Sequence, residues 1–208
     1  MKKYVTELIG TFFLVLTVGC TVVSGAQGVI APLAIGSALM IMIFAGGHIS
    51  GGHYNPAVTL GVWMRGRCDT KDVLPYFVSQ ILGAALAAWA TIYLVGAPKA
   101  APGPLAVGPA MLAEFLFTFA LVFVVLNVAT AKGTAGNSFY GLAIGFTVTV
   151  GACAVGKISG AAFNPAVAVG VSIMGLAKWS TLWIYLVSEL LAGAMAALTF
   201  KGVNPGGE

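Results

Sequence analysis

The run GHISGGHYNPAV at residues 47–58 returns as GKISGAAFNPAV at residues 156–167. The two runs lie 109 positions apart, and each ends in the tripeptide Asn-Pro-Ala followed by valine. In each copy, asparagine is a favoured N-cap residue, and proline suits the first helical position because it lacks the N–H that would have no helical partner there. The runs therefore predict two short helices, which begin at Pro56 and Pro165 after glycine-containing irregular segments.

The repeat extends well beyond these two runs. Matches at the same offset include LAIG at 33–36 and 142–145, Tyr76 with Tyr185, and Ser79 with Ser188. Nearer to the N-terminus the offset becomes 107, so that Glu7 corresponds to Glu114. These ordered matches indicate a duplicated chain, with repeats at about 1–100 and about 108–204 inside a single domain at 1–208.

The composition indicates that a lipid bilayer is the solvent of this chain. Hydrophobic residues make up 59% of the sequence, only 8% is charged, and the mean hydropathy is +0.99. A soluble domain carries about 25% charged residues, and a spanning helix needs roughly 20 apolar residues. The predicted spans are 4–24, 31–48, 73–95, 108–130, 138–156 and 179–200. The pieces at 55–65 and 164–174 are too short to span. The prediction is an all-α membrane protein with six transmembrane helices and two re-entrant half-helices.

Three spans in each half make the two halves enter the membrane from opposite sides. The result is an inverted repeat, with a pseudo-two-fold axis in the membrane plane. With the N-terminus inside, basic residues divide seven to three between the cytoplasmic side (Lys2, Lys3, Arg65, Arg67, Lys71, Lys132, Lys201) and the outer side (Lys99, Lys157, Lys178). This excess predicts a multi-pass protein of the cell membrane with both termini in the cytoplasm.

Irregular backbone at membrane depth is tolerated only inside protein or beside a water-filled cavity. The segments before the two motifs are therefore expected to line a pore with their backbone, at Gly51, Gly52, His53, Gly160 and Ala162. The two half-helices would meet near the midplane, where each N-terminus carries roughly +0.5 elementary charge. That field repels cations and protons. The amides of Asn55 and Asn164 can donate to a passing oxygen. The pattern predicts passage of small neutral molecules.

The sequence resembles a known family of membrane proteins. The run HISGGHYNPAVT at 48–59 is very similar to the aquaporin pattern of the major intrinsic proteins, and the likeness extends over essentially the whole chain. The resemblance implies a right-handed bundle and a homotetramer of independent, passive pores in membrane lipid, without a cofactor. The pore motifs would be Asn55-Pro56-Ala57 and Asn164-Pro165-Ala166. The minimal loops resemble prokaryotic members.

The resemblance also assigns roles to polar residues outside the motifs. It implies that Glu7 and Glu114 accept backbone N–H groups from the re-entrant segments, and that His48 lines the cytoplasmic half of the pore. Lys157 holds the matching position on the outer half, where it either adds a positive charge to the vestibule or snorkels to the interface. Glu189 stands where the first half has Gln80, which indicates a hydrogen-bonding role without an essential charge.

The second motif departs from the family pattern at the position after Ala166. Most aquaporins place an arginine there, whereas this chain has Val167. Ungapped counting gives the other positions of the selectivity filter as Ile35, Ala152 and Ala161, so the filter has no side-chain donor and no fixed cation. A wider, less polar constriction suits ammonia, hydrogen peroxide, dissolved gas, glycerol or urea as well as water, while a narrow apolar one conducts poorly because it dewets. The sequence leaves these alternatives open.

Other function classes fit the sequence less well. A secondary transporter needs an ion or proton site at the midplane, and the two motifs offer only neutral donors. A closed, structural membrane protein remains a third alternative. His48 and His53 lack a third ligand for a metal site. We expect neither an enzyme nor a nucleic-acid partner, because no nucleophile and base lie near the pore and no basic run is present.

Overall fold

The computed structural model describes residues 1–26 and 28–205, so residues 27 and 206–208 of the predicted domain lie outside the described part. The chain folds into the helices α1 Lys2–Val23, α2 Ile30–Ser50, α3 Pro56–Met64, α4 Thr70–Val95, α5 Val107–Thr130, α6 Tyr140–Ser159, α7 Pro165–Met174 and α8 Leu182–Val203. Two 3-10 turns, at Lys132–Thr134 and Trp179–Thr181, join neighbouring helices. The described residues contain no β-strand, which confirms the all-α prediction.

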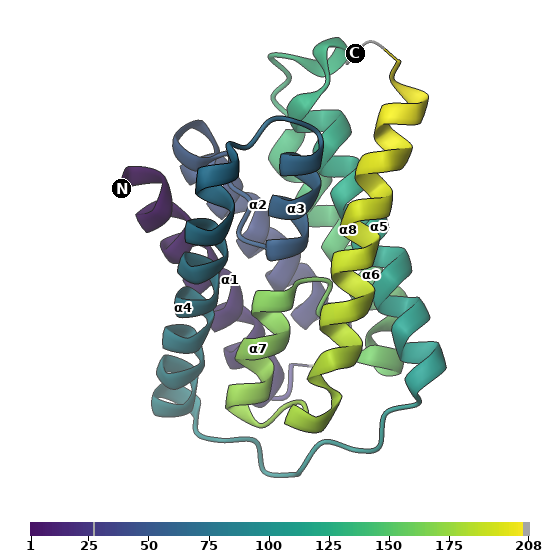
Figure 1. Ribbon diagram of the computed structural model, residues 1–208. Helices are drawn as coiled ribbons and strands as arrows, with labels where there is room; N and C mark the ends of the chain where they lie inside the picture. Colours follow the sequence, from purple (N-terminus) through teal and green to yellow (C-terminus); the bar gives the residue numbers. More distant parts are fainter. Residues whose placement is uncertain (27, 206–208) are drawn as a thin grey trace.

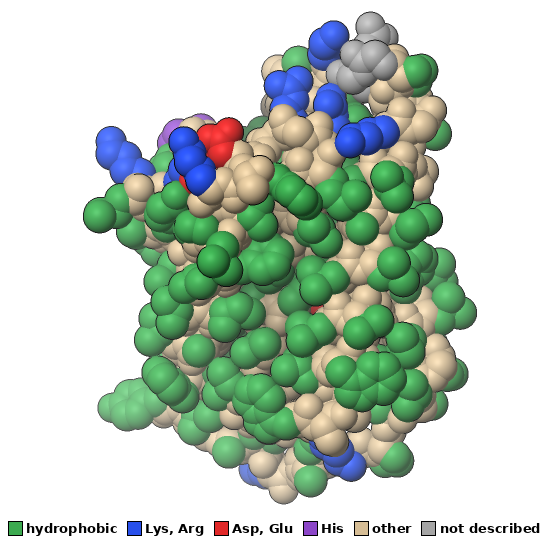
Figure 2. Space-filling model, in the orientation of Figure 1, with side chains coloured by type: hydrophobic (Ala, Val, Ile, Leu, Met, Phe, Trp, Pro, Cys, Tyr) green, Lys and Arg blue, Asp and Glu red, His purple; other side chains and the backbone are tan. Residues whose placement is uncertain are grey.

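Six of these helices are long and apolar enough to cross a membrane. The shortest of them has 20 residues, which gives a length of about 30 Å at 1.5 Å per residue. The half-helices α3 and α7 have 9 and 10 residues and cannot cross. Figure 2 shows hydrophobic side chains over the middle of one face, with lysine and arginine at its two ends. The predicted architecture of six spans and two short helices is therefore confirmed.

The helices pack as two equivalent sets. In the first half α1 lies against α2 and α4, and in the second half α5 lies against α6 and α8. Each half-helix inserts between the halves, because α3 packs against α8 while α7 packs against α4. The two half-helices lie one above the other near the centre of the bundle, and α2 crosses α6 (Figure 1). The N-termini of α3 and α7 are thereby brought together.

Small residues let the backbones approach at these crossings. A Cβ atom added at Gly83 would lie 2.4 Å from the carbonyl oxygen of Leu8, where α4 crosses α1. A Cβ atom added at Gly193 would lie 2.6 Å from the carbonyl oxygen of Ala57, where α8 crosses α3. Membrane helices associate through such close van der Waals packing, since lipid tails are as apolar as the side chains.

Candidate pore

The two half-helices begin with the same cap. Asn55 is extended at the N-cap of α3, and its side-chain oxygen accepts the backbone N–H of Ala57 at 2.8 Å. Asn164 caps α7 in the same way and accepts the N–H of Ala166 at 2.9 Å. In both cases a proline occupies the first helical position. Both half-helices therefore begin at the predicted residues. Each has the asparagine cap and the first-position proline that these residue types favour.

The two asparagines also join the halves. Nδ2 of Asn55 donates to the carbonyl oxygen of Phe163 at 2.8 Å, and Nδ2 of Asn164 donates to the carbonyl oxygen of Tyr54 at 2.9 Å. A side-chain amide has two N–H donors, so each asparagine keeps a second donor beyond this cross-link. Both residues line the same cavity. The arrangement places two fixed amide donors side by side at the meeting point of two helix N-termini.

The segments before the motifs adopt an unusual backbone conformation. Tyr54 and Phe163, at matching positions, both have φ of 50°, in the left-handed region. Such conformations cost a non-glycine residue roughly 1–3 kcal/mol, and they persist only where surrounding contacts impose them. Both aromatic side chains are 1% exposed, which supplies part of that constraint.

Glu7 supplies the rest of the constraint in the first half. Its Oε1 accepts from the hydroxyl of Ser50 at 2.7 Å and from the N–H of His53 at 3.0 Å. Its Oε2 accepts from the N–H of Tyr54 at 2.6 Å and from Nε2 of Gln80 at 2.8 Å. Four donors compensate for burying the carboxylate. Because the N–H groups point to Glu7, this contact fixes the direction of the segment's peptide planes.

Glu114 makes the equivalent contacts in the second half. Its two carboxyl oxygens accept the N–H groups of Ala162 at 3.1 Å and Phe163 at 2.7 Å.

Two tyrosines at matching repeat positions bond to the ends of the helices that precede these segments. The hydroxyl of Tyr76 donates to the carbonyl oxygen of Ser50 at 2.7 Å, and that of Tyr185 donates to the carbonyl oxygen of Ser159 at 2.6 Å. The sequence paired these tyrosines but assigned them no role.

A cavity of about 420 Å³, here called the loop-side cavity, contains the two asparagines. Its wall includes all four residues assigned to the filter, namely Ile35, Ala152, Ala161 and Val167. Of the predicted backbone positions, Gly52, His53, Gly160 and Ala162 line it as well. Lys157 lines it together with Lys178.

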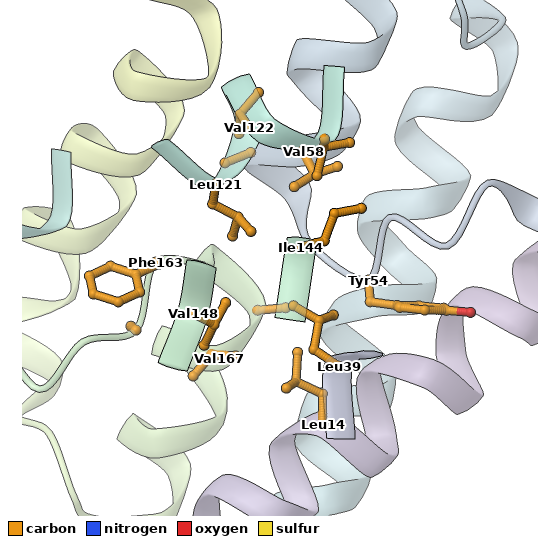
Figure 3. Packing of buried hydrophobic residues seen from close by; sticks show 14 of the residues in the cluster. Leu14, Leu39, Tyr54, Val58, Leu121, Val122, Ile144, Val148, Phe163 and Val167 are labelled. Atoms are coloured by element: carbon orange, nitrogen blue, oxygen red, sulfur yellow. The ribbon is translucent and has the colours of Figure 1, made fainter. Parts of the chain in front are cut away.

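Most of the cavity wall consists of aliphatic side chains, most of which, apart from filter residues such as Ile35 and Val167, were not predicted from the sequence. Four pairs at matching repeat positions line it: Leu14 with Leu121, Val18 with Val125, Ile35 with Ile144, and Leu39 with Val148. Val58 and Val167 form a fifth pair. Figure 3 shows Leu14, Leu39, Val148 and Val167 converging from four different helices. The repeat offset was the signal able to identify these residues, because both halves contribute the same positions.

The connection between α4 and α5 forms one end of the loop-side cavity. Pro102, Gly103, Pro104 and Leu105 all line it, and the connection passes under the bundle at the end away from the termini (Figure 1). No function was predicted for this connection from the sequence. No regular periodicity marks it, so its position over the cavity was not predictable from the chain alone.

A second cavity of about 850 Å³ opens at the end where both termini lie, and is called the termini-side cavity. His48 and Gly51 line it, together with Lys3, Arg67 and Asp72. His53 lines both cavities and thus stands between them. Its Nδ1 lies 3.1 Å from the hydroxyl oxygen of Thr59, and its ring packs edge-on to that of Tyr76. The described residues hold no group of three histidine, cysteine or acidic side chains able to bind a metal ion.

Comparison with known proteins places this architecture in a family. The family model described as major intrinsic protein matches residues 1–200. Aquaporin NIP1-1 of rice (Oryza sativa subsp. japonica) is 38% identical over 208 residues, covering 94% of this chain and 72% of its own. Aquaporin AqpM of Methanothermobacter thermautotrophicus is 33% identical and covers 96% of both chains. Glycerol uptake facilitator protein-like 6 of Lactiplantibacillus plantarum is 35% identical and covers 95% of both.

The fold has a counterpart among solved structures as well. The X-ray structure of the aquaglyceroporin from Plasmodium falciparum matches with a TM-score of 0.83, covering 97% of this chain and 96% of that chain at 22% identity. At that identity the match shows a common fold, whereas the match to the family model and the relatives above 30% identity show membership of the family. The chain therefore belongs to the major intrinsic protein family, the aquaporins, and is a passive membrane channel for water or small solutes rather than an enzyme.

Proposed function

We propose that water and small neutral solutes pass in single file through the loop-side cavity and between Asn55 and Asn164. The observation that carries the proposal is the pair of amides at the meeting N-termini of α3 and α7, which lie in a largely aliphatic wall. A solute oxygen crossing that wall has these amides as its fixed donors near the centre. The chain thereby acts as one channel domain over 1–208, with repeats at about 1–100 and 108–204.

The charge distribution favours neutral solutes over cations. The two helix N-termini each carry roughly +0.5 elementary charge and face the same point. Lys157 and Lys178 add positive charge at the end of the loop-side cavity, and no carboxylate among the described residues lines that cavity. Glu7 and Glu114 are fully buried and hydrogen-bonded to backbone N–H groups, so they offer no binding site for a transported ion. These features support a channel over an ion-coupled transporter.

The filter formed by Ile35, Ala152, Ala161 and Val167 favours a second candidate, in which the main solute is ammonia, hydrogen peroxide, a dissolved gas or a small polyol. None of the four side chains carries a hydrogen-bond donor. A solute that loses its hydration at this level gains no replacement bond from them, which penalises water relative to ammonia or a dissolved gas, whereas passage of hydrogen peroxide or a polyol depends on the width that the small side chains leave. Two relatives have names that refer to glycerol uptake or to an aquaglyceroporin, which agrees with a broader solute range.

We further propose that both termini lie in the cytoplasm of a cell whose plasma membrane holds the protein as a homotetramer. The termini lie at the same end of the bundle (Figure 1), and lysine and arginine are more abundant at that end of the face in Figure 2. Cytoplasmic ends of membrane proteins carry such an excess. Native mass spectrometry of the detergent-solubilised protein tests the assembly.

Stopped-flow light scattering on proteoliposomes tests the channel proposal. Water, glycerol, urea and ammonia fluxes are compared with those of empty vesicles, and proton flux is followed with an entrapped pH dye. We expect water flux to rise with a low activation energy and proton flux to stay at the background level. Fluxes equal to those of empty vesicles for every solute would instead support a closed structural protein. Saturable, gradient-driven uptake would support a transporter.

A further inference from the structure

The two halves of the channel differ at one buried polar position. In the first half, Nε2 of Gln80 donates to Glu7 at 2.8 Å and to the hydroxyl oxygen of Thr59 at 3.0 Å. The corresponding residues of the second half are Glu189 and Ala168. The amide that donates to Glu7 is thus replaced by a carboxyl group, and the neighbouring hydroxyl is replaced by a methyl group. An ionised Glu189 has no proton to donate.

Glu189 is fully buried, and its carboxyl group lies against that of Glu114. Neither oxygen of Glu189 accepts a hydrogen bond of normal geometry from any described residue. The backbone N–H of Asn164 approaches the same carboxyl group without reaching that geometry. Glu114, by contrast, uses its oxygens to accept the N–H groups of Ala162 and Phe163. The carboxylate of Glu114 alone therefore accepts these backbone N–H groups, and Glu189 is not needed as an acceptor.

None of the elements packed against α8 places a cation near Glu189. These elements are α3, α5, α7 and the turn at Trp179–Thr181, and their one titratable residue is Glu114. Arg65, which follows α3, lies over the ring of Phe200, eleven positions or about 16 Å further along α8. On α8 itself, the hydroxyl of Tyr185 is committed to the carbonyl oxygen of Ser159. Lys201 lies twelve positions further along the helix, about 18 Å away at 1.5 Å per residue. Two adjacent buried carboxyl groups without a counter-charge cannot readily ionise together.

We propose that Glu189 is a positioning residue held as a neutral carboxylic acid, whose O–H donates to Glu114 where Gln80 donates to Glu7. One buried proton then completes the hold on Ala162 and Phe163, which precede Asn164. When that proton is lost to solvent at alkaline pH, two negative charges face each other and the segment loosens. The first half has the amide of Gln80 at this position, and an amide does not titrate. The protonation itself is independent of the solute that passes through the proposed pore.

Infrared spectroscopy of the full chain, in a detergent without ester groups, tests the protonation directly. A protonated carboxylic acid gives a carbonyl stretch at higher frequency than the two carboxylate bands, and the stretch shifts in D₂O. We expect this band in the parent protein at neutral pH and its loss in Glu189→Gln. The matched variant Gln80→Glu builds the same pair in the first half and is expected to add a second band. A parent band that survives unchanged in Glu189→Gln would overturn the proposal.

Stability and permeability separate the donor role from simple packing. Glu189→Leu removes the donor and is expected to lower the thermal unfolding midpoint, whereas Glu189→Gln, which keeps a donor, is expected to restore it. Equal midpoints for leucine and glutamine would contradict a donor role.

In proteoliposomes, the water flux of the parent is expected to fall as the pH rises from neutral to alkaline. The flux of Glu189→Gln, relative to its own value at neutral pH, is expected to stay flat. If no variant conducts, the proposed function fails while the infrared result still decides this inference.

Discussion

The side-chain amide of Asn55 donates a hydrogen bond to the carbonyl oxygen of Phe163, from one half of the chain to the other, at 2.8 Å. The oxygen of the same side chain accepts the N–H of Ala57 and so caps α3. A single buried side chain therefore starts a half-helix and ties it to the opposite half. The symmetric bond from Asn164 to Tyr54 closes a reciprocal pair at the centre of the bundle.

Replacement of Asn55 by alanine is expected to destabilise the protein and to reduce water flux. It removes an N-cap worth about 1 kcal/mol and a buried hydrogen bond worth about 1 kcal/mol, so we expect a loss of roughly 2–3 kcal/mol once the orphaned acceptor is included. Thermal unfolding in detergent and stopped-flow water flux measure the two effects. Asn55→Asp is the matched variant, since it keeps the cap acceptor and loses the donor. An aspartate variant that conducts water without ion leakage would show that the donor is dispensable.

The sequence predicts this fold well because three independent signals agree. Proline and asparagine mark the starts of α3 and α7. Because the chain is duplicated, each span recognised in one half predicts the position of its counterpart in the other half. The predicted span 108–130, for example, differs from α5 (Val107–Thr130) by one residue. The length of each apolar stretch separates spanning helices from half-helices, because a bilayer sets a minimum length for a span.

The wall of the site was harder to predict. Helices such as α5 are apolar on all sides, so periodicity does not separate residues such as Leu121, which lines the cavity, from Leu116, which faces outward. The connection at 102–105 carries no pattern that places it over the cavity. The sequence did identify Glu189 as a substitution for Gln80. The sequence did not show that neither oxygen of Glu189 receives a donor, nor that the neighbouring Glu114 already accepts the backbone N–H groups.

Val167→Arg is expected to narrow the loop-side cavity and to make its wall polar. Val167 is 4% exposed and lines the cavity, so a long cationic side chain there must extend into it. We expect glycerol and urea fluxes to fall at least about tenfold, the effect of roughly 1.4 kcal/mol at the barrier, with water flux retained and proton flux still at the background level. Val167→Leu adds volume without donors and is expected to lower every flux. If neither variant changes any solute flux, Val167 does not form the constriction.

Two neighbouring positions on α6 offer a matched test of the cavity wall. Ala152 lines the loop-side cavity, whereas Cys153 is exposed on the outside of the bundle. Cys68 lines the termini-side cavity and is best removed first, as Cys68→Ala. In that background we expect a small mercurial to leave water flux unchanged, and the further substitution Ala152→Cys to make the flux sensitive. Inhibition through Cys153 alone would place the cavity on another face of α6.

Gly193→Ala tests how tightly α8 holds the first half-helix. The added methyl group would lie 2.6 Å from the carbonyl oxygen of Ala57, and a backbone atom cannot rotate away as a side chain can. Overpacking of this kind costs about 1–3 kcal/mol. Gly202→Ala is the control on the same helix, because nothing lies within 4 Å of its added carbon, and it is expected to leave stability unchanged or slightly raised.

The position of the clash makes this variant informative about the pore as well. Ala57 is the residue whose N–H the side chain of Asn55 accepts, so a displaced Ala57 moves the cap and stretches the bond from Asn55 to Phe163. Gly83→Ala creates a comparable clash, 2.4 Å from the carbonyl oxygen of Leu8, between two spanning helices. We therefore expect both alanine variants to lower the unfolding midpoint, and Gly193→Ala to lose more water flux at matched stability. Equal losses of flux would mean that global loosening, rather than the register of α3, limits permeation.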